Sequence, residues 1–150
     1  MKKVKVFSTA IALLLAVSSF AINDDATSTN SKVNTTFKKD FSTASHVVWQ
    51  KKDEVYFATF QLNNIYAEAA FNDAGELIAL SKTIATHQLP LAITVSLNNS
   101  YPGYTIAKNA TEIMYENQTH YYLNISNGKN LIKLKCTVNG ELVVENKEKL

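Results

Sequence analysis

The sequence has no arginine, one cysteine, four glycines and two prolines in its 150 residues. Without arginine, no guanidinium group is available for bidentate recognition of phosphate or carboxylate groups. The lone Cys136 excludes an intramolecular disulfide, so the fold must be held by non-covalent interactions. Four dispersed glycines also exclude a glycine-rich phosphate-binding loop.

Patterns that indicate catalysis or metal binding are equally scarce. The histidines His46, His87 and His120 are dispersed and lack the short spacing of metal ligands. No serine lies in a G-x-S-x-G context. The stretch Asn72–Glu76 lacks the alternating carboxylates of a calcium loop, and turn chemistry explains its Asp and Gly. We therefore predict no catalytic residues, no metal site and no cofactor, and we expect that the protein is not an enzyme.

The N-terminus has the pattern of an export signal. Basic residues in 1–7 precede a short apolar run in 8–20, and Ser19 and Ala21 occupy the small-residue positions of a cleavage site. We predict cleavage after Ala21 and export to the periplasm or the exterior, with a single membrane anchor as the alternative. Residues 22–31 are small and polar, which predicts a flexible tether.

Removing this leader changes the charge balance. Lys2, Lys3 and Lys5 leave, so 12 of the 15 basic residues remain against 13 acidic ones. A nearly neutral protein lacks the positive surplus that binding to nucleic acid requires. The remaining chain is long enough for one compact domain, and we expect a monomer without a membrane span.

Periodicity predicts one helix followed by four strands. Val33, Phe37 and Phe41 recur every four residues, the spacing of a helix with one buried stripe, and Asn34 or Thr35 could cap it. Alternating apolar residues and turn residues then predict four strands, which cover residues 47–49, 56–62, 65–71 and 76–83.

The second half of the chain repeats this order. FNDAGELI at 71–78 and CTVNGELV at 136–143 are offset by 65 residues, and the same offset maps apolar residues onto apolar residues through two strands. A second helix is predicted over Leu89–Leu97, with Pro90 in its first turn and an end at YPGY (101–104). The helices are offset by less, which indicates extra residues near 112–117. We predict one domain, 32–150, with repeats of about 32–84 and 85–146.

These motifs resemble a known family. A helix is followed by FSTA or YPGY, then a V-x-W-like strand, Y-x-A-x-F, and F-x-x-x-G-E-L. This order over 33–144 resembles the secreted bacterial PepSY-like proteins, also described as β-lactamase-inhibitor-like (BLIP-like). The resemblance implies an α+β fold, with two tandem α-β-β-β-β repeats that form an antiparallel sheet and place their helices on one face. A cystatin-like fold is the architectural alternative.

Strand alternation assigns residues to the two faces of the sheet. Cys136 alternates with Lys133, Lys135 and Thr137, which places the thiol on a buried face with a structural role. Tyr56, Ala58, Phe60 and Leu62 should likewise pack under the first helix. The opposite, open face would then carry aromatic and charged residues that we predict to bind a partner: Phe57, Tyr66, Glu68, Tyr122, Leu131, Lys133 and Lys135.

If both repeats join one sheet, Phe57, Tyr66, Tyr122 and Leu131 would form a single exposed apolar patch with a charged rim. Such a composition suits recognition of a protein or peptide, and inhibition of an enzyme is one such role. An ordinary solvated sheet face is the simpler interpretation. We predict an exported, non-enzymatic binding module. The alternatives are small-ligand sensing in a groove between the repeats and an exported enzyme with an unrecognised site.

Overall fold

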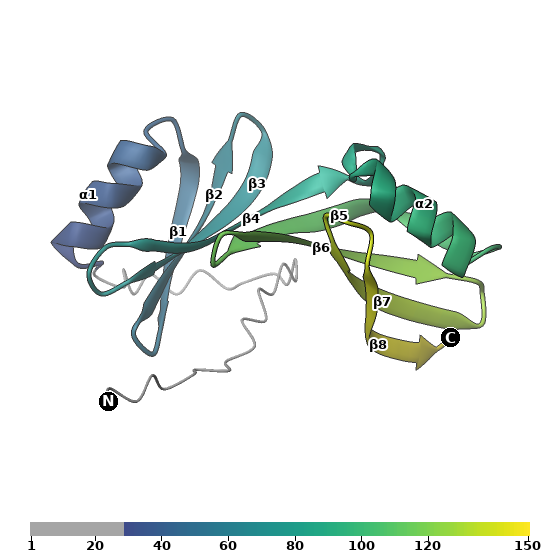
Figure 1. The fold of residues 1–150 in the computed structure, drawn as a ribbon. Coiled ribbons are helices and arrows are strands. Elements are labelled where there is room, and N and C mark those ends of the chain that lie inside the picture. Colours follow the sequence, from purple (N-terminus) through teal and green to yellow (C-terminus); the bar gives the residue numbers. More distant parts are fainter. Residues whose placement is uncertain (1–28) are drawn as a thin grey trace, which may run out of the picture.

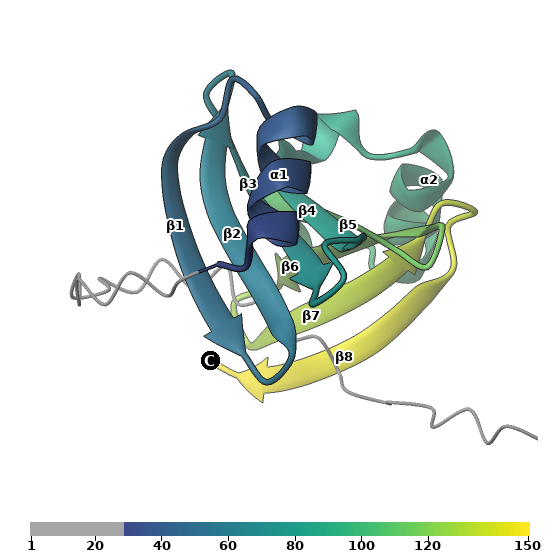
Figure 2. The ribbon, with the colours of Figure 1, turned by 90° about the vertical axis from the view of Figure 1, so that its left-hand side faces the viewer.

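The computed structural model describes residues 29–150, so the predicted leader, its cleavage site and most of the tether lie outside the described residues. Residues 29–150 form one eight-stranded antiparallel sheet with an α-helix near each end (Figure 1), and both α-helices lie on the same side of this sheet (Figure 2). The elements follow the order α1 (Ser31–Asp40), β1 (Ser45–Lys52), β2 (Val55–Leu62), β3 (Ile65–Asn72), β4 (Leu77–Ala85), η1 (Thr86–Gln88), α2 (Leu91–Ser100), β5 (Thr105–Tyr115), β6 (Gln118–Ser126), β7 (Asn130–Thr137) and β8 (Leu142–Lys149).

This arrangement confirms the predicted α+β class. The strands pair in sequence order from β1 to β8, so the sheet is open and each strand neighbours the next one in the chain. Two helices on one eight-stranded sheet also differ from the cystatin-like alternative, in which the sheet wraps one helix. Neither α-helix within residues 29–150 is long and apolar enough to cross a membrane.

The predicted helix boundaries were shifted. α1 begins at Ser31, inside the predicted tether, because Asn30 rather than Asn34 or Thr35 is the N-cap. The Asn30 side-chain oxygen accepts a hydrogen bond from the backbone N–H of Val33 at 2.9 Å. The basic residues Lys38 and Lys39 lie in the last turn, where they stabilise the negative end of the helix dipole.

The second helix also starts later than predicted. α2 begins at Leu91, and Pro90 is its N-cap instead of a residue of its first turn. The short helix η1 lies before it, a feature that no sequence pattern predicted. The buried side of α2 presents Ile93 and Leu97, as the predicted stripe requires.

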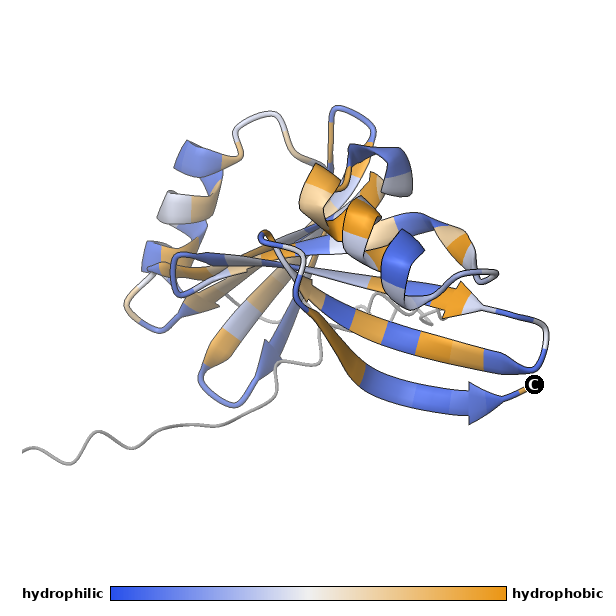
Figure 3. Cartoon of the chain, turned by 45° about the vertical axis from the view of Figure 1, so that its right-hand side comes forward, coloured by the Kyte–Doolittle hydropathy of each residue, from blue (hydrophilic) through white to orange (hydrophobic). Residues whose placement is uncertain are grey.

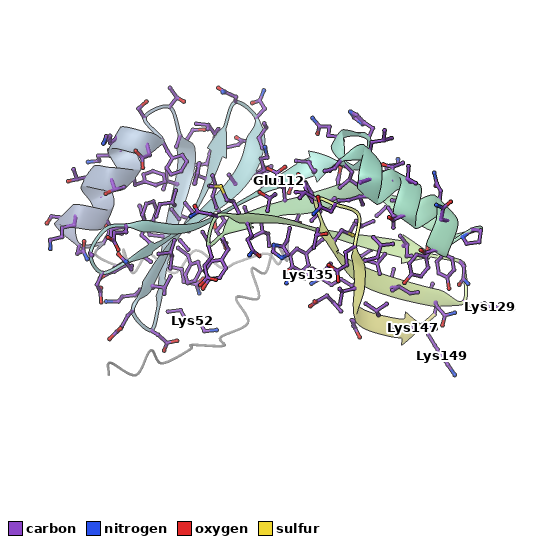
Figure 4. All side chains as sticks on the ribbon, viewed as in Figure 1. Lys52, Glu112, Lys129, Lys135, Lys147 and Lys149 are labelled. Carbon is purple, nitrogen blue, oxygen red and sulfur yellow. The ribbon has the colours of Figure 1, made fainter. Side chains whose placement is uncertain are left out.

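Each helix covers its own hydrophobic core. The first core lies under α1 and includes Val33, Phe37, Phe60 and Phe71, whereas the second lies under α2. Cys136 is completely buried in the second core, which confirms its predicted place. Lys82 and Glu112 form an ion pair of 3.0 Å on the helix side, and Figure 4 shows Glu112 between the two halves. Charged groups therefore separate the two cores on this side of the sheet.

The pairing of β4 with β5 joins the two halves. It runs from Ala79 opposite Tyr115 to Ala85 opposite Asn109. β5 has 11 residues against 8 in β1, and its last residues extend along β4. The extra residues predicted near 112–117 correspond to the end of β5 and its turn to β6, where β5 extends along β4.

The shared Gly-Glu-Leu motif has a packing reason in both halves. Gly75 and Gly140 have positive φ angles of 81° and 88°. A Cβ atom at Gly75 would lie 2.8 Å from the backbone carbon of Lys32 in α1, and one at Gly140 would lie 2.6 Å from the carbonyl oxygen of Ala92 in α2. Glycine thus allows each helix to approach the turn before the last strand of its half.

Candidate functional site: the open face of the sheet

The open face is the side of the sheet opposite α1 and α2. Residues paired across neighbouring strands share a face, so the pairing register assigns every strand residue to one side. We call residues that are paired directly across successive strands a row. One row of the open face runs from β2 to β5 and consists of Phe57, Ala70, Ala79 and Tyr115. The row beside it crosses from β2 to β6 through Thr59, Glu68, Ser81, Ile113 and His120.

All seven predicted binding residues lie on strands at positions that face this side. They form two groups, because the sheet follows chain order. The first group lies on β2 and β3, and the second lies on β6 and β7; the groups are Phe57, Tyr66 and Glu68, and Tyr122, Leu131, Lys133 and Lys135.

The expected single apolar patch is therefore wrong. Phe57 on β2 and Tyr122 on β6 lie four strands apart, which at the usual strand spacing is about 19 Å along the sheet. Exposure also differs from the expectation. Tyr66 is 60% exposed, whereas Phe57, Tyr122 and Leu131 are half-buried, because side chains on a sheet face cover one another.

The second group combines aromatic and cationic residues. The Lys133 Nζ lies 5.8 Å from the centre of the Tyr122 ring, which is within the range of a cation–π interaction. Lys135 is paired directly with Tyr122 and points away from the helices (Figure 4). A shallow pocket of about 210 Å³ adjoins them, and its lining is Asn124, Leu131, Lys133, Asn146 and Glu148.

His120 lies on β6, two residues before Tyr122, in the row of the open face that also contains Glu68. Partial burial and the positive charge of Lys135 both lower the pKa of the His120 imidazole, with burial the larger cause. The neutral imidazole, which can donate one hydrogen bond and accept another, is therefore favoured near neutral pH.

Small, buried side chains lie beside the first group on β3 and β4. Ala70, Ala79 and Ser81 are 1%, 3% and 1% exposed, although they lie on the open face. Glu68 lies beside these side chains and accepts a long hydrogen bond of 3.4 Å from the Thr59 hydroxyl. Desolvation raises the pKa of the Glu68 carboxyl, and the hydrogen bond from Thr59 opposes that shift.

Sequence reasoning missed the residues that β4 and β5 contribute, among them Ala79, Ser81 and Ile113. A register irregularity in the pairing of β3 with β4 follows Ala70, so simple alternation does not carry the face assignment across this turn. The mixed apolar and polar sequence LIALSKTIA contains Ser81 among apolar residues, which is the one signal that could have marked it.

No family model matches the sequence, and no curated protein is similar to it. Solved structures do match. A BLIP-like protein from Bacteroides fragilis is 17% identical, with a TM-score of 0.67 over 85% of this chain and 90% of the other. The fold is BLIP-like. The resemblance predicted from the sequence is thus confirmed at the level of the fold.

Two further structures share this BLIP-like fold. A DUF2874 family protein from Bacteroides uniformis is 18% identical, with a TM-score of 0.66 over 80% of this chain and 88% of that one. A candidate periplasmic protein from Bacteroides eggerthii is 20% identical, with a TM-score of 0.67 over 81% and 89% of the two chains.

Proposed function

We propose that the protein is an exported binding module that recognises a protein or peptide through the open face of its sheet. The observation that carries this proposal is the asymmetry of the sheet. Both helices cover one side, and the other side presents aromatic and charged side chains in two groups, on β2 and β3 and on β6 and β7.

The composition of the open face supports the proposal. Half-buried aromatic side chains such as Phe57 and Tyr122 are already partly ordered, so a partner gains apolar contact with little loss of side-chain entropy. Tyr66, at 60% exposed, adds an amphipathic ring that can pack and donate a hydrogen bond. Lys133 and Lys135 supply charge beside Tyr122, which favours one orientation of a partner.

The solved neighbours support export and binding without identifying a partner. One of them is described as a candidate periplasmic protein and another as BLIP-like, a name that refers to an inhibitor protein. The N-terminal pattern of basic and apolar residues agrees with export.

The test compares two double variants that remove apolar side chains from opposite sides of the protein. Phe57→Ala with Tyr122→Ala changes the open face. Leu91→Ala with Val95→Ala changes the outer side of α2, where these residues are 78% and 49% exposed. Each purified mature protein is cross-linked in an envelope extract of the producing cells, and captured proteins are quantified by mass spectrometry.

We expect the open-face variant to lose at least about tenfold in the capture of one or a few proteins, since aromatic anchors carry much of an interface's binding energy. The α2 variant should capture the same proteins as the unmodified protein. Equal capture by all three, with folding verified by circular dichroism, would show that the open face is only a solvated surface.

A further inference from the structure

Glu68 lies near the centre of the first group, and no basic side chain faces it there. Its direct neighbours in the row are Thr59 on β2 and Ser81 on β4. The next residues of the row are Val48 on β1 and Ile113 on β5. Glu68 thus has polar but uncharged neighbours on both sides.

Neither ion pair within residues 29–150 involves Glu68. One joins Lys51 to Asp73, and the other joins Lys82 to Glu112 on the helix side. The carboxylate is half-buried, and its hydrogen bond to Thr59 is long. A carboxylate in such a place is only partly compensated for the water it has lost.

Ser81 provides the second, independent observation. It is 1% exposed, and its Oγ has no hydrogen-bond partner among the described residues. Ser81 is paired directly with Glu68 across β3 and β4, so both side chains leave the sheet on the open face. A buried hydroxyl without a partner is uncommon, because its lost hydrogen bonds to water are not replaced. Two adjacent groups that can accept hydrogen bonds are therefore incompletely satisfied.

A partner that covers this face would remove the remaining water from Glu68. A buried carboxylate must then be paired with a cation or take up a proton, since an isolated buried charge is strongly unfavourable. We propose that Glu68 and Ser81 form the receptor for a lysine or arginine side chain of the protein partner. This inference rests on the proposed function and specifies the chemistry of the partner.

The surroundings of Glu68 suit an inserted cationic side chain. Ala70 and Ala79 in the adjoining row are small and apolar, so they place no competing charge beside Glu68. Tyr66, two residues before Glu68 on the same strand, presents an exposed ring whose face attracts cations. The Ser81 Oγ is buried, so it can accept an N–H from an inserted side chain only after the side chains that cover it shift. The Glu68 carboxylate and the Tyr66 ring thus lie on the same face of β3, beside the buried Ser81 hydroxyl of β4.

The test uses a random peptide library of about twelve residues, displayed on phage and selected on the immobilised mature protein. The enriched peptide is then synthesised, and its affinity is measured for the unmodified protein, for Glu68→Gln and for Glu148→Gln. Glu148→Gln is the matched control, since Glu148 is exposed on the same face at β8 and its removal changes the net charge equally. Phe57→Ala with Tyr122→Ala tests whether the peptide uses the open face.

We expect enriched peptides to contain lysine or arginine next to apolar residues. Glu68→Gln should weaken binding at least about tenfold, because it leaves a desolvated cation unpaired, whereas Glu148→Gln should change it less than about threefold, as expected for an exposed charge. Replacing the cation of the peptide by glutamine should cause the same loss, and the two changes together should cost less than their sum.

Other outcomes separate the inference from the function on which it rests. Two results overturn the inference and leave the proposed function intact. In the first, peptides need Phe57 and Tyr122 for binding but lack a cation. In the second, Glu68→Gln lowers peptide affinity no more than Glu148→Gln does. Peptides that bind the Phe57→Ala, Tyr122→Ala variant unchanged count against the proposed function itself, as does a selection that enriches no peptide. Circular dichroism of each variant verifies that lost binding does not reflect unfolding.

Discussion

Two phenylalanines on β2 test the face assignment directly. Phe60 and Phe57 lie three residues apart on one strand and point to opposite sides of the sheet. Replacing either by alanine removes the same atoms, so the difference between the two losses of unfolding free energy depends only on the surroundings of each ring. We expect Phe60→Ala to destabilise the protein far more than Phe57→Ala.

The structure sets the magnitude of this difference. Phe60 is 1% exposed, and its ring centre lies 5.2 Å from that of Phe37 and 4.8 Å from that of Phe41. Removing such a ring loses its transfer free energy and leaves a cavity under α1, which typically costs about 3–5 kcal/mol. Phe57 is half-buried beside Ala70, where water can enter the vacated space. Its loss should therefore cost about 1–2 kcal/mol.

Urea denaturation followed by circular dichroism measures both values, provided that the dependence on urea concentration is unchanged between variants. A cost of this size for Phe60→Ala is a large part of the 5–15 kcal/mol that stabilises a typical domain, so partial unfolding without urea is an expected result. Equal costs, or a larger cost for Phe57→Ala, would mean that the two faces are assigned the wrong way round.

Three further predictions concern buried groups. Burial raises the pKa of the Cys136 thiol from 9.0 to about 11, so a thiol reagent should label the native protein only at the rate of unfolding. Cys136→Ser should lower the free energy of unfolding by about 1–3 kcal/mol, because the new hydroxyl would lose its hydrogen bonds to water in the core. Rapid labelling would contradict its burial. Gly140→Ala should lower the free energy of unfolding by about 1–3 kcal/mol more than Gly128→Ala, since both glycines have positive φ but only Gly140 contacts α2. Thermal melts compare the two variants. Equal losses of stability would show that backbone strain alone matters. Burial raises the pKa of Glu68, so its ionised form destabilises the fold at neutral pH and this cost disappears as the pH falls and the group is protonated. Glu68→Gln should therefore raise the melting temperature at pH 7 more than at about pH 3, and a larger gain in acid would reverse the assigned sign.

Local patterns predicted most of the elements. Alternation identified the buried residues of β2, β3, β6 and β7, because a half-buried strand must place apolar side chains on one side. The helix boundaries were less accurate, since Asn30 and Pro90 compete with neighbouring polar residues as caps and only the folded chain selects among them.

The sequence predicted the residues that β2, β3, β6 and β7 contribute to the candidate site, but neither those of β4 and β5 nor the arrangement of the site. Alternation of side chains along each strand placed four of these residues on the open face, and the strand register agrees; they are Phe57, Glu68, Tyr122 and Lys135. Alternation does not determine the distances between these residues, because the order of strands across the sheet is a property of the whole fold. For this reason the structure contains two groups of residues where the sequence analysis predicted one patch.

The sequence by itself determined the composition of each face and the two buried stripes, since these depend on neighbours within one element. The close approach of α1 to Gly75 and of α2 to Gly140 belongs to the tertiary structure. Only the tertiary structure decided how β4 meets β3 and β5. That pairing placed Ser81 beside Glu68 and held Phe57 away from Tyr122. Strand pairing between segments far apart in the chain depends on how the two cores fit together, and no local periodicity encodes that fit.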